Sequence, residues 1–317
     1  MRSVFSLHAA LLSLCIALSI VPLISRALTE GDYTYTVTNG QATITGFTKS
    51  YTGALSITNV LGGYPVSSIS SNAFYKCSKL TSVTIPSSVT AIGDSAFYYC
   101  YNVNSVTIPG SVTVIGKAAF SSIHGLTNLV VGTGVKYMGD YAFDYCSNLT
   151  SVNIPDSVTT IGNAAFNYCS GLTSVIIPAS VTSIGNNAFY YCFRLQRILF
   201  QSTPPTLGGS SVFTSSPAIL YYLPAFASTW PSSFGGRPTL CWNPTVQQDT
   251  TFGFASDRFG FNIAGTPDIP VKVEATTNLA TGVWTPLTNA TLGASGSIHF
   301  TDPSTNKPSC FYRIVWW

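Results

Sequence analysis

An Ala-Phe pair that returns every 23 residues constrains this 317-residue chain more than any other feature. An internal period of this length is typical of repeat proteins, in which each unit buries its apolar face against its neighbours. The phenylalanines that keep the step are Phe74, Phe97, Phe120, Phe143, Phe166 and Phe189. We expect them to stack as one internal spine.

Other apolar positions keep the same period. In the unit Leu80-Thr-Ser-Val-Thr-Ile, apolar and polar residues alternate as in a β-strand. Val83 and Ile85 are therefore predicted to point inward, and Ser82 and Thr84 outward. A proline follows in most units and ends the strand, because it has no amide to donate.

The predicted fold is mostly β. It is a right-handed solenoid of 23-residue coils, followed by a small C-terminal β-sandwich. Each coil combines a short strand with a short helical or 3₁₀ turn that the Ala-Phe pair begins. Gly93 and its equivalents are expected to supply a tight bend.

The first residues have the three parts of a secretory signal. Arg2 gives a positive start, residues 9–23 are apolar, and Ser25 and Ala27 place small residues before a cleavage site. A retained membrane anchor is the rival interpretation, but the run is shorter than the ~20 residues of a spanning helix. No later segment is long enough to span, so we predict export without an integral membrane segment in the mature chain.

The pattern LTSVTIPSSVTAIGDSAFYYC resembles the BspA-type leucine-rich repeat of secreted and surface proteins of bacteria. The resemblance covers residues 32 to about 242, including a β-rich beginning and a degenerate last coil at Phe213. It implies a repeat solenoid, and it implies adhesion, host-protein binding or matrix assembly without choosing among them.

After Trp242 the period disappears, and short β-type runs separated by turn residues follow. The segment VEATTNLATGVWTPL, with GSIHFTDPSTNKPSCFYRI after it, is similar to immunoglobulin-like accessory modules at the C-terminus of exported bacterial proteins. The matching positions are Glu274, Leu279, Trp284, Pro286, Leu287, Phe300, Asp302, Pro303, Phe311, Tyr312 and Arg313.

These observations divide the chain into six parts. We predict, in order, a signal peptide (1–27), a β-rich N-terminal cap (28–68), the repeats (69–213), a C-terminal cap of the array (214–242), a linker (243–251) and the immunoglobulin-like module (252–317).

Cysteine also keeps the 23-residue step, with Ile123 in the one exceptional unit. The members are Cys77, Cys100, Cys146, Cys169 and Cys192. A position that accepts isoleucine behaves as a buried apolar site, which favours a ladder of reduced thiols. An exported protein also permits disulfides, between neighbouring coils or between Cys241 and Cys310, so this alternative stays open.

Two outward-facing columns are candidate binding surfaces. One is an interrupted tyrosine ladder, because aromatic rims bind sugars and protein side chains. The other is a strand lane that becomes apolar toward its end. Their residues are Tyr99, Tyr145, Tyr168 and Tyr191 in the ladder, and Asn128, Val130, Asn153, Ile176, Arg197 and Leu199 in the lane. The alternative is that the tyrosines only pack along the coil edges and that the lane is an ordinary solvated strand face.

Composition excludes several functions. The formal charge is +3, about +1 without the leader, and no basic block is present, which argues against nucleic-acid binding. The 3 histidines have no partners predicted by the register, and no catalytic, phosphate-binding or metal-binding motif occurs. We therefore expect neither an enzyme nor a protein with a cofactor or metal.

The sequence favours an exported, monomeric, non-enzymatic protein that mediates protein–protein contact or adhesion to a cell surface or matrix. Many weak contacts would be spread over one rigid face, and the partner would be an extracellular protein or polysaccharide. Two alternatives remain. The array is a structural spacer without a discrete ligand, or the C-terminal module binds polysaccharide and the array only presents it.

Overall fold

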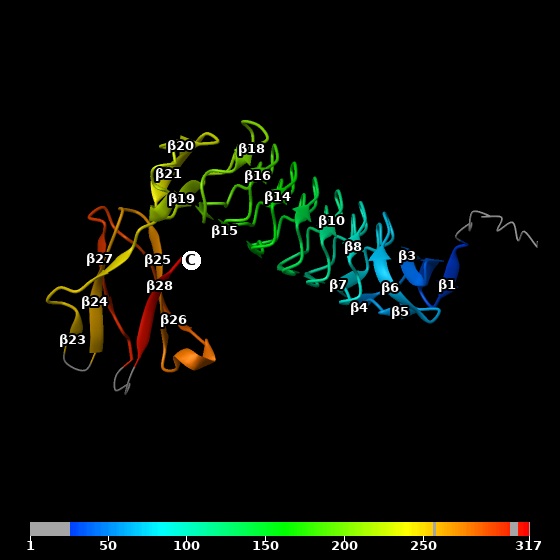
Figure 1. Cartoon of the computed structure of the whole chain (residues 1–317), viewed down its shortest axis with the longest axis horizontal. Helices are drawn as coiled ribbons and strands as arrows, with labels where there is room; N and C mark the ends of the chain where they lie inside the picture. The colour runs from blue at the N-terminus through cyan, green and yellow to red at the C-terminus, as the bar shows by residue number, and fades with distance from the viewer. Residues whose placement is uncertain (1–25, 256–257, 305–309, 317) are drawn as a thin grey trace, which may run out of the picture.

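The computed structural model describes residues 26–255, 258–304 and 310–316. Figure 1 shows coils stacked in a row, with a differently built unit at the C-terminal end of the array. Residues 1–25 of the predicted signal peptide lie outside the described residues. Within the described part of the chain, no helix has the length and apolar character needed to cross a membrane.

Antiparallel strands open the array. β1 (Leu28–Glu30) pairs with β2 (Tyr33–Thr38), which pairs with β3 (Gln41–Phe47). The pairing becomes parallel where β3 meets β6 (Tyr64–Ile69), and β5 (Val60–Leu61) pairs antiparallel with β6. These first strands cover the N-terminal end of the parallel coils.

One side of the array is a ladder of two-residue parallel strands. Neighbours are in 23-residue register, so Val114 lies between Ala91 and Tyr137. In order from β6, the strands are β8 (Ala91–Ile92), β10 (Val114–Ile115), β12 (Tyr137–Met138), β14 (Thr160–Ile161), β16 (Ser183–Ile184) and β18 (Thr206–Leu207).

The opposite side carries longer strands in two sheets. The first sheet contains β4 (Gly53–Ser56), β7 (Leu80–Thr84), β9 (Ser105–Ile108) and β11 (Asn128–Val131). The second contains β13 (Ser151–Asn153), β15 (Ser174–Ile177), β17 (Arg197–Phe200), β19 (Ile219–Tyr222), β21 (Arg237–Cys241) and β20 (Ser233–Phe234). Val83 and Ile85 are buried while Thr84 is exposed, which confirms the predicted alternation.

The corner that contains the Ala-Phe pair is a run of turns, so the predicted helical or 3₁₀ segment is wrong. Its backbone N–H groups donate alternately to carbonyls of the same coil and to carbonyls of the next coil. The N–H of Tyr75 donates to Asn72 within the coil, whereas the N–H groups of Phe74 and Lys76 donate to Ala96 and Tyr98 of the next coil. Asn72 and Lys76 have positive φ angles of 61° and 60°, which a helix does not accommodate.

The glycine of the Ile-Gly step allows close stacking and does not make the bend that we expected. No positive φ is found at Gly93 or Gly139. A Cβ atom on Gly139 would lie 2.6 Å from the carbonyl carbon and oxygen of Gly116 in the preceding coil. The residue is glycine because neighbouring backbones touch there.

The phenylalanines fill the centre of every coil and have 0% exposure. From Phe74 to Phe189, neighbouring ring centroids are 4.7–5.5 Å apart and neighbouring planes differ by 4–10°. Phe213 continues the stack at 6.0 Å, and Phe47 contacts its first ring at 5.0 Å. The 23-residue period thus produces a continuous aromatic spine.

Two antiparallel sheets make up the C-terminal unit. In the first, β24 (Arg258–Ala264) pairs with β22 (Thr245–Gln247), β23 (Gly253–Ala255) and β27 (Ser297–Thr301). In the second, β25 (Pro270–Thr276) lies between β26 (Thr285–Thr291) and β28 (Phe311–Val315). The predicted linker (243–251) therefore contains a strand, β22, whose Val246 pairs with Ile263 of the C-terminal unit. The described 3₁₀ helices are η1 (Pro224–Phe226) and η2 (Leu279–Thr281).

Candidate binding surface

The strand lane is exposed only in its middle. Asn128, Val130 and Asn153 face solvent, and Val130 is 48% exposed. Ile176 and Arg197 are half-buried. Leu199 is only 3% exposed, so it does not belong to a free surface.

The C-terminal unit covers the apolar end of the lane. Ile176, Leu199, Tyr221 and Leu240 lie side by side on β15, β17, β19 and β21. They pack into one apolar cluster with residues of the C-terminal unit such as Val271. The lane becomes apolar because it is an intramolecular docking face, which corrects its interpretation as a ligand site at this end.

Aromatic residues complete this junction. The Trp316 ring packs against the Tyr221 ring at a centroid distance of 4.9 Å. The indole N–H of Trp242 donates to the carbonyl of Pro270 at 2.7 Å. The Tyr221 hydroxyl donates to the carbonyl of Asp268 at 3.4 Å. Burial raises the pKa of Tyr221, in agreement with its position inside the contact.

The tyrosine ladder stays on the surface and is ordered by the backbone. Tyr145, Tyr168 and Tyr191 have φ angles of 57°, 54° and 55°. Their N–H groups donate to carbonyls of the next coil, which holds this unusual conformation. Because the three backbones are equivalent, the side chains leave in one direction. Their rings stack at 4.4 and 4.8 Å with planes 6° and 4° apart.

Ser122 interrupts the ladder between Tyr99 and Tyr145, and Ser121 beside it stands in register with Tyr98. Ser121 and Ser122 are 2% and 6% exposed, since larger side chains stand on both sides. Beside them, Asp144 accepts a hydrogen bond from the Asn167 amide at 2.9 Å. Burial raises the pKa of Asp144 to about 6, although this hydrogen bond opposes the shift.

A second aromatic cluster lies on the N-terminal side of this interruption. The Tyr98 and Tyr99 rings are 4.2 Å apart, and Tyr75 lies 5.8 Å from Tyr98. The Lys76 ammonium is 5.1 Å from the centre of the Tyr75 ring and 5.8 Å from that of Tyr99. This end of the ladder is therefore aromatic and cationic, whereas Asp144 places a carboxyl group in the middle.

A polar groove of about 400 Å³ lies next to the C-terminal end of the ladder. The residues that line it are Ser147, Asn148, Thr150, Ser170, Gly171, Phe193 and Arg194. Phe193 is 53% exposed, and its ring packs edge-on against Tyr191 at 5.1 Å. The stacked tyrosines, Phe193 and the groove thus form one surface of the repeat array. We call this surface the tyrosine corner, and the name does not refer to the feature of immunoglobulin folds that is also so called.

The cysteine column lies inside the array. All five members are buried, and four thiols donate to the phenylalanine carbonyl of the preceding coil, as Cys169 does to Phe143 at 3.2 Å. Burial raises the pKa of Cys77 to about 11 and that of Cys192 to about 12. Such thiols react slowly, because the thiolate is the reactive form.

Cys241 and Cys310 are far apart. Cys310 immediately precedes β28, while Trp316 at the other end of this strand lies near Trp242. Six residues of extended chain span about 20 Å, so these two cysteines do not meet in this structure.

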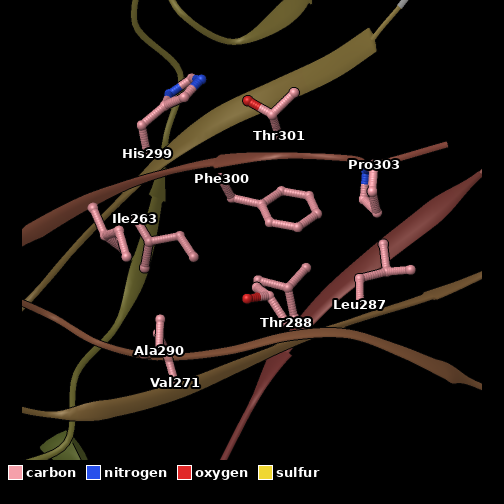
Figure 2. A pocket seen from close by; sticks show the side chains of 11 residues that line it. Ile263, Val271, Leu287, Thr288, Ala290, His299, Phe300, Thr301 and Pro303 are labelled. Carbon is pink, nitrogen blue, oxygen red and sulfur yellow. The ribbon is translucent and has the colours of Figure 1, made fainter. Parts of the chain in front are cut away.

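A cavity of about 310 Å³ lies between the two C-terminal sheets, and Figure 2 shows the side chains that line it. Phe300 points into it together with Ile263, Val271 and Leu287, whereas His299 lies on the other side of its strand. Apolar side chains line the cavity together with the polar residues Thr288, His299 and Thr301.

The two histidines within the described residues, His124 and His299, are not gathered into a reactive site. His124 is exposed on the third coil. His299 Nδ1 is 2.8 Å from the side-chain oxygen of Asn262, whose amide donates to Asp249 at 2.9 Å. Among the described residues, no group of three or more histidine, cysteine or acidic side chains is placed to hold a metal ion.

The docking face and the groove were not predicted from the sequence. Tyr221, Leu240 and Trp242 lie where the 23-residue period fades, so no register assigned them to a surface. The sequence does contain a signal for the groove. Other coils mostly follow the cysteine position with a polar and a small or polar residue, whereas the sixth has Phe193-Arg194.

Comparison with known proteins identifies the repeats. Residues 48–173 and 136–222 match the BspA type Leucine rich repeat region, in six copies. The structure is similar to a T. pallidum leucine-rich repeat protein, with 28% identity and a TM-score of 0.55, over 61% of this chain and 90% of that one. A leucine rich cell surface protein from Faecalibacterium prausnitzii has 29% identity and a TM-score of 0.45, over 63% and 71%. No curated protein matches the sequence.

Proposed function

The chain belongs to the BspA-type leucine-rich repeat family, and from this membership we propose that it is an exported, non-enzymatic binding protein of a bacterial surface or its surroundings. Export is proposed from the leader-like residues 1–27. We also propose that the C-terminal unit is an immunoglobulin-like sandwich that acts as an accessory module.

The tyrosine corner is the observation that carries this proposal. Tyr145, Tyr168 and Tyr191 lie partly exposed in one stack, and Phe193 extends it. Aromatic side chains supply large contact areas at a low entropic cost, and they are enriched at binding hot spots. The continuous core fixes their spacing before a partner arrives, so little ordering is needed on binding.

Repetition makes the contact multivalent. Three successive coils offer one tyrosine each, Tyr145, Tyr168 and Tyr191, at a fixed spacing, so a partner with several weak contacts gains from binding them together. The exposed middle of the strand lane, Asn128, Val130 and Asn153, lies on another side of the same coils and is a secondary candidate. Polysaccharide binding by the cavity in the C-terminal unit stays the other alternative, since Thr288, His299 and Thr301 contribute polar groups to its lining.

The test uses the full mature chain, residues 28–317, and a panel of immobilised extracellular proteins and polysaccharides. We expect Tyr168→Ala to weaken binding to the panel member that the wild type binds, by about tenfold or more.

Tyr141→Ala is the matched control. Tyr141 is 40% exposed and has a φ angle of 60°, but its neighbours in register are Ala118 and Ala164, so it has no ring to stack on. Equal loss in both variants would contradict the tyrosine corner, and no binding by the wild type would favour the spacer alternative.

A further inference from the structure

The groove in the tyrosine corner is created by a missing side chain. Two residues follow each cysteine, and the second is Asn148, Gly171 and Arg194 in three successive coils. A Cβ atom at Gly171 would lie 2.7 Å from the Ser147 carbonyl oxygen, so this position excludes larger residues. Asn148 and Arg194 therefore border a gap one coil wide.

Several polar groups of the groove are unused. Asn148 and Arg194 are exposed, and the Asn148 amide, the Thr150 hydroxyl and the Arg194 guanidinium have no hydrogen-bond or ion-pair partner among the residues that the structure describes. The Ser170 hydroxyl makes a long hydrogen bond, of 3.4 Å, to the Ser147 carbonyl. The groove thus presents an amide, hydroxyls and one full positive charge to a ligand.

Phe193 adds an apolar face. Its contact with Tyr191 is perpendicular, at 83°, and Phe193 remains 53% exposed. An aromatic face beside amide and hydroxyl groups suits a sugar ring, which has C–H groups on its faces and hydroxyls on its edge. Because a guanidinium binds carboxylates with two parallel hydrogen bonds, the sugar should carry a carboxylate.

We propose that this groove binds an acidic polysaccharide, with Phe193 against a sugar ring and Arg194 on its carboxylate. This inference rests on the proposed function and gives the tyrosine corner a ligand class. A peptide is less favoured, because the groove has no apolar pocket for a side chain and no lining residue belongs to a strand that could extend a sheet.

The experiment titrates the full mature chain with polygalacturonate, alginate and hyaluronate, by calorimetry at low salt. We expect at least one to bind, and its uncharged methyl ester to bind at least tenfold more weakly. Arg194→Gln should weaken binding about 10- to 100-fold, and Phe193→Ala about tenfold. Phe193→Trp should restore it.

Lys136→Gln removes the same charge from an exposed position elsewhere on the array and should leave binding unchanged. Melting curves of all variants should coincide with the wild type, because the substituted side chains are exposed.

Three results would overturn the proposal. They are no binding of any of the acidic polysaccharides, equal loss in Lys136→Gln and Arg194→Gln, and polyglutamate binding through Arg194 as tightly as the polysaccharide. If any one of these three results is found while the extracellular panel still binds in a Tyr168-dependent way, the groove assignment fails and the proposed function stands. If Tyr168→Ala also has no effect, both fail.

Discussion

At the residue scale, the repeat positions are fixed by backbone contacts between coils as much as by side-chain packing. Gly139 is required because the preceding coil leaves no room for a Cβ atom. The thiol of Cys169 fills a buried site and also donates to a carbonyl, which isoleucine at the equivalent position 123 cannot do. The same residue type recurs at each of these positions because the same contact recurs every 23 residues.

Gly139→Ala is expected to destabilise the array by about 1–3 kcal/mol, because backbone atoms cannot move aside as a flexible side chain does. Denaturant unfolding followed by circular dichroism measures this loss. Gly110→Ala is the control, since the nearest atom to its added Cβ is 3.6 Å away. If both variants unfold at the same denaturant concentration, close coil contact does not explain the conserved spacing.

Asp144 should give the fold a pH dependence. Burial raises its pKa to about 6 from 3.8, so the folded protein holds a proton that the unfolded chain has released between about pH 4 and 6. The stabilisation is complete below pH 4 and is lost as the pH rises through 6. Allowing for solvent screening of this half-buried group, the loss is about 1 kcal/mol.

Asp144→Asn should remove this dependence, so the variant should gain stability relative to the wild type as the pH rises from 4 to 7. Urea unfolding at both pH values measures the difference. Asp156→Asn, at an exposed position, is the control. A constant difference between Asp144→Asn and the wild type at both pH values would contradict the assignment.

At the element scale, the short strands are too small to be stable alone, and the aromatic spine joins them. Each phenylalanine stacks on the coils before and after it, at 5.5 and 5.4 Å for Phe143. Stability is therefore shared between neighbouring coils, as expected for a one-dimensional array.

Phe143→Ala should cost about 3–5 kcal/mol, since it opens a cavity between two stacked rings. Thermal unfolding measures the loss, and Phe193→Ala is the control because that ring is exposed. An unchanged melting curve for Phe143→Ala would contradict the stacked core.

The strands and their alternation could be predicted from the sequence, because a period fixes both the register and the face of each residue. The turns could not. Left-handed φ angles at Asn72, Tyr99 and Tyr145 are held by hydrogen bonds to the next coil. Asparagine favours this conformation, but tyrosine gives no local signal for it. The role of glycine was missed for the same reason, since a close approach depends on a neighbouring coil.

At the scale of the whole molecule, the array and the C-terminal unit share an apolar cluster that extends from Leu199 to Trp316. The sequence showed an apolar strand lane but not what covers it, because the covering residues lie far along the chain from the lane. Exposed and docked apolar positions look alike in a sequence. The tyrosine corner remains free in this arrangement, as Tyr145 is 41% exposed.

Tyr221→Ala should loosen this junction, with a loss of about 3 kcal/mol from the cavity beside Trp316. We expect the C-terminal unit to become sensitive to protease at lower temperature than the repeats. Tyr64→Ala, at an exposed tyrosine of the N-terminal cap, is the control. Unchanged protease sensitivity in Tyr221→Ala would argue against a docked unit.

In the function that we propose, this molecule binds its partner with the tyrosine corner. Hydroxyl-radical footprinting of the full chain, with and without the partner from the extracellular panel, decides whether it does. We predict protection of Tyr145, Tyr168, Tyr191 and Phe193, with unchanged oxidation of Tyr64 and Tyr141. Protection confined to the C-terminal unit or to the strand lane at Val130, with the stacked tyrosines still oxidised, would contradict the claim.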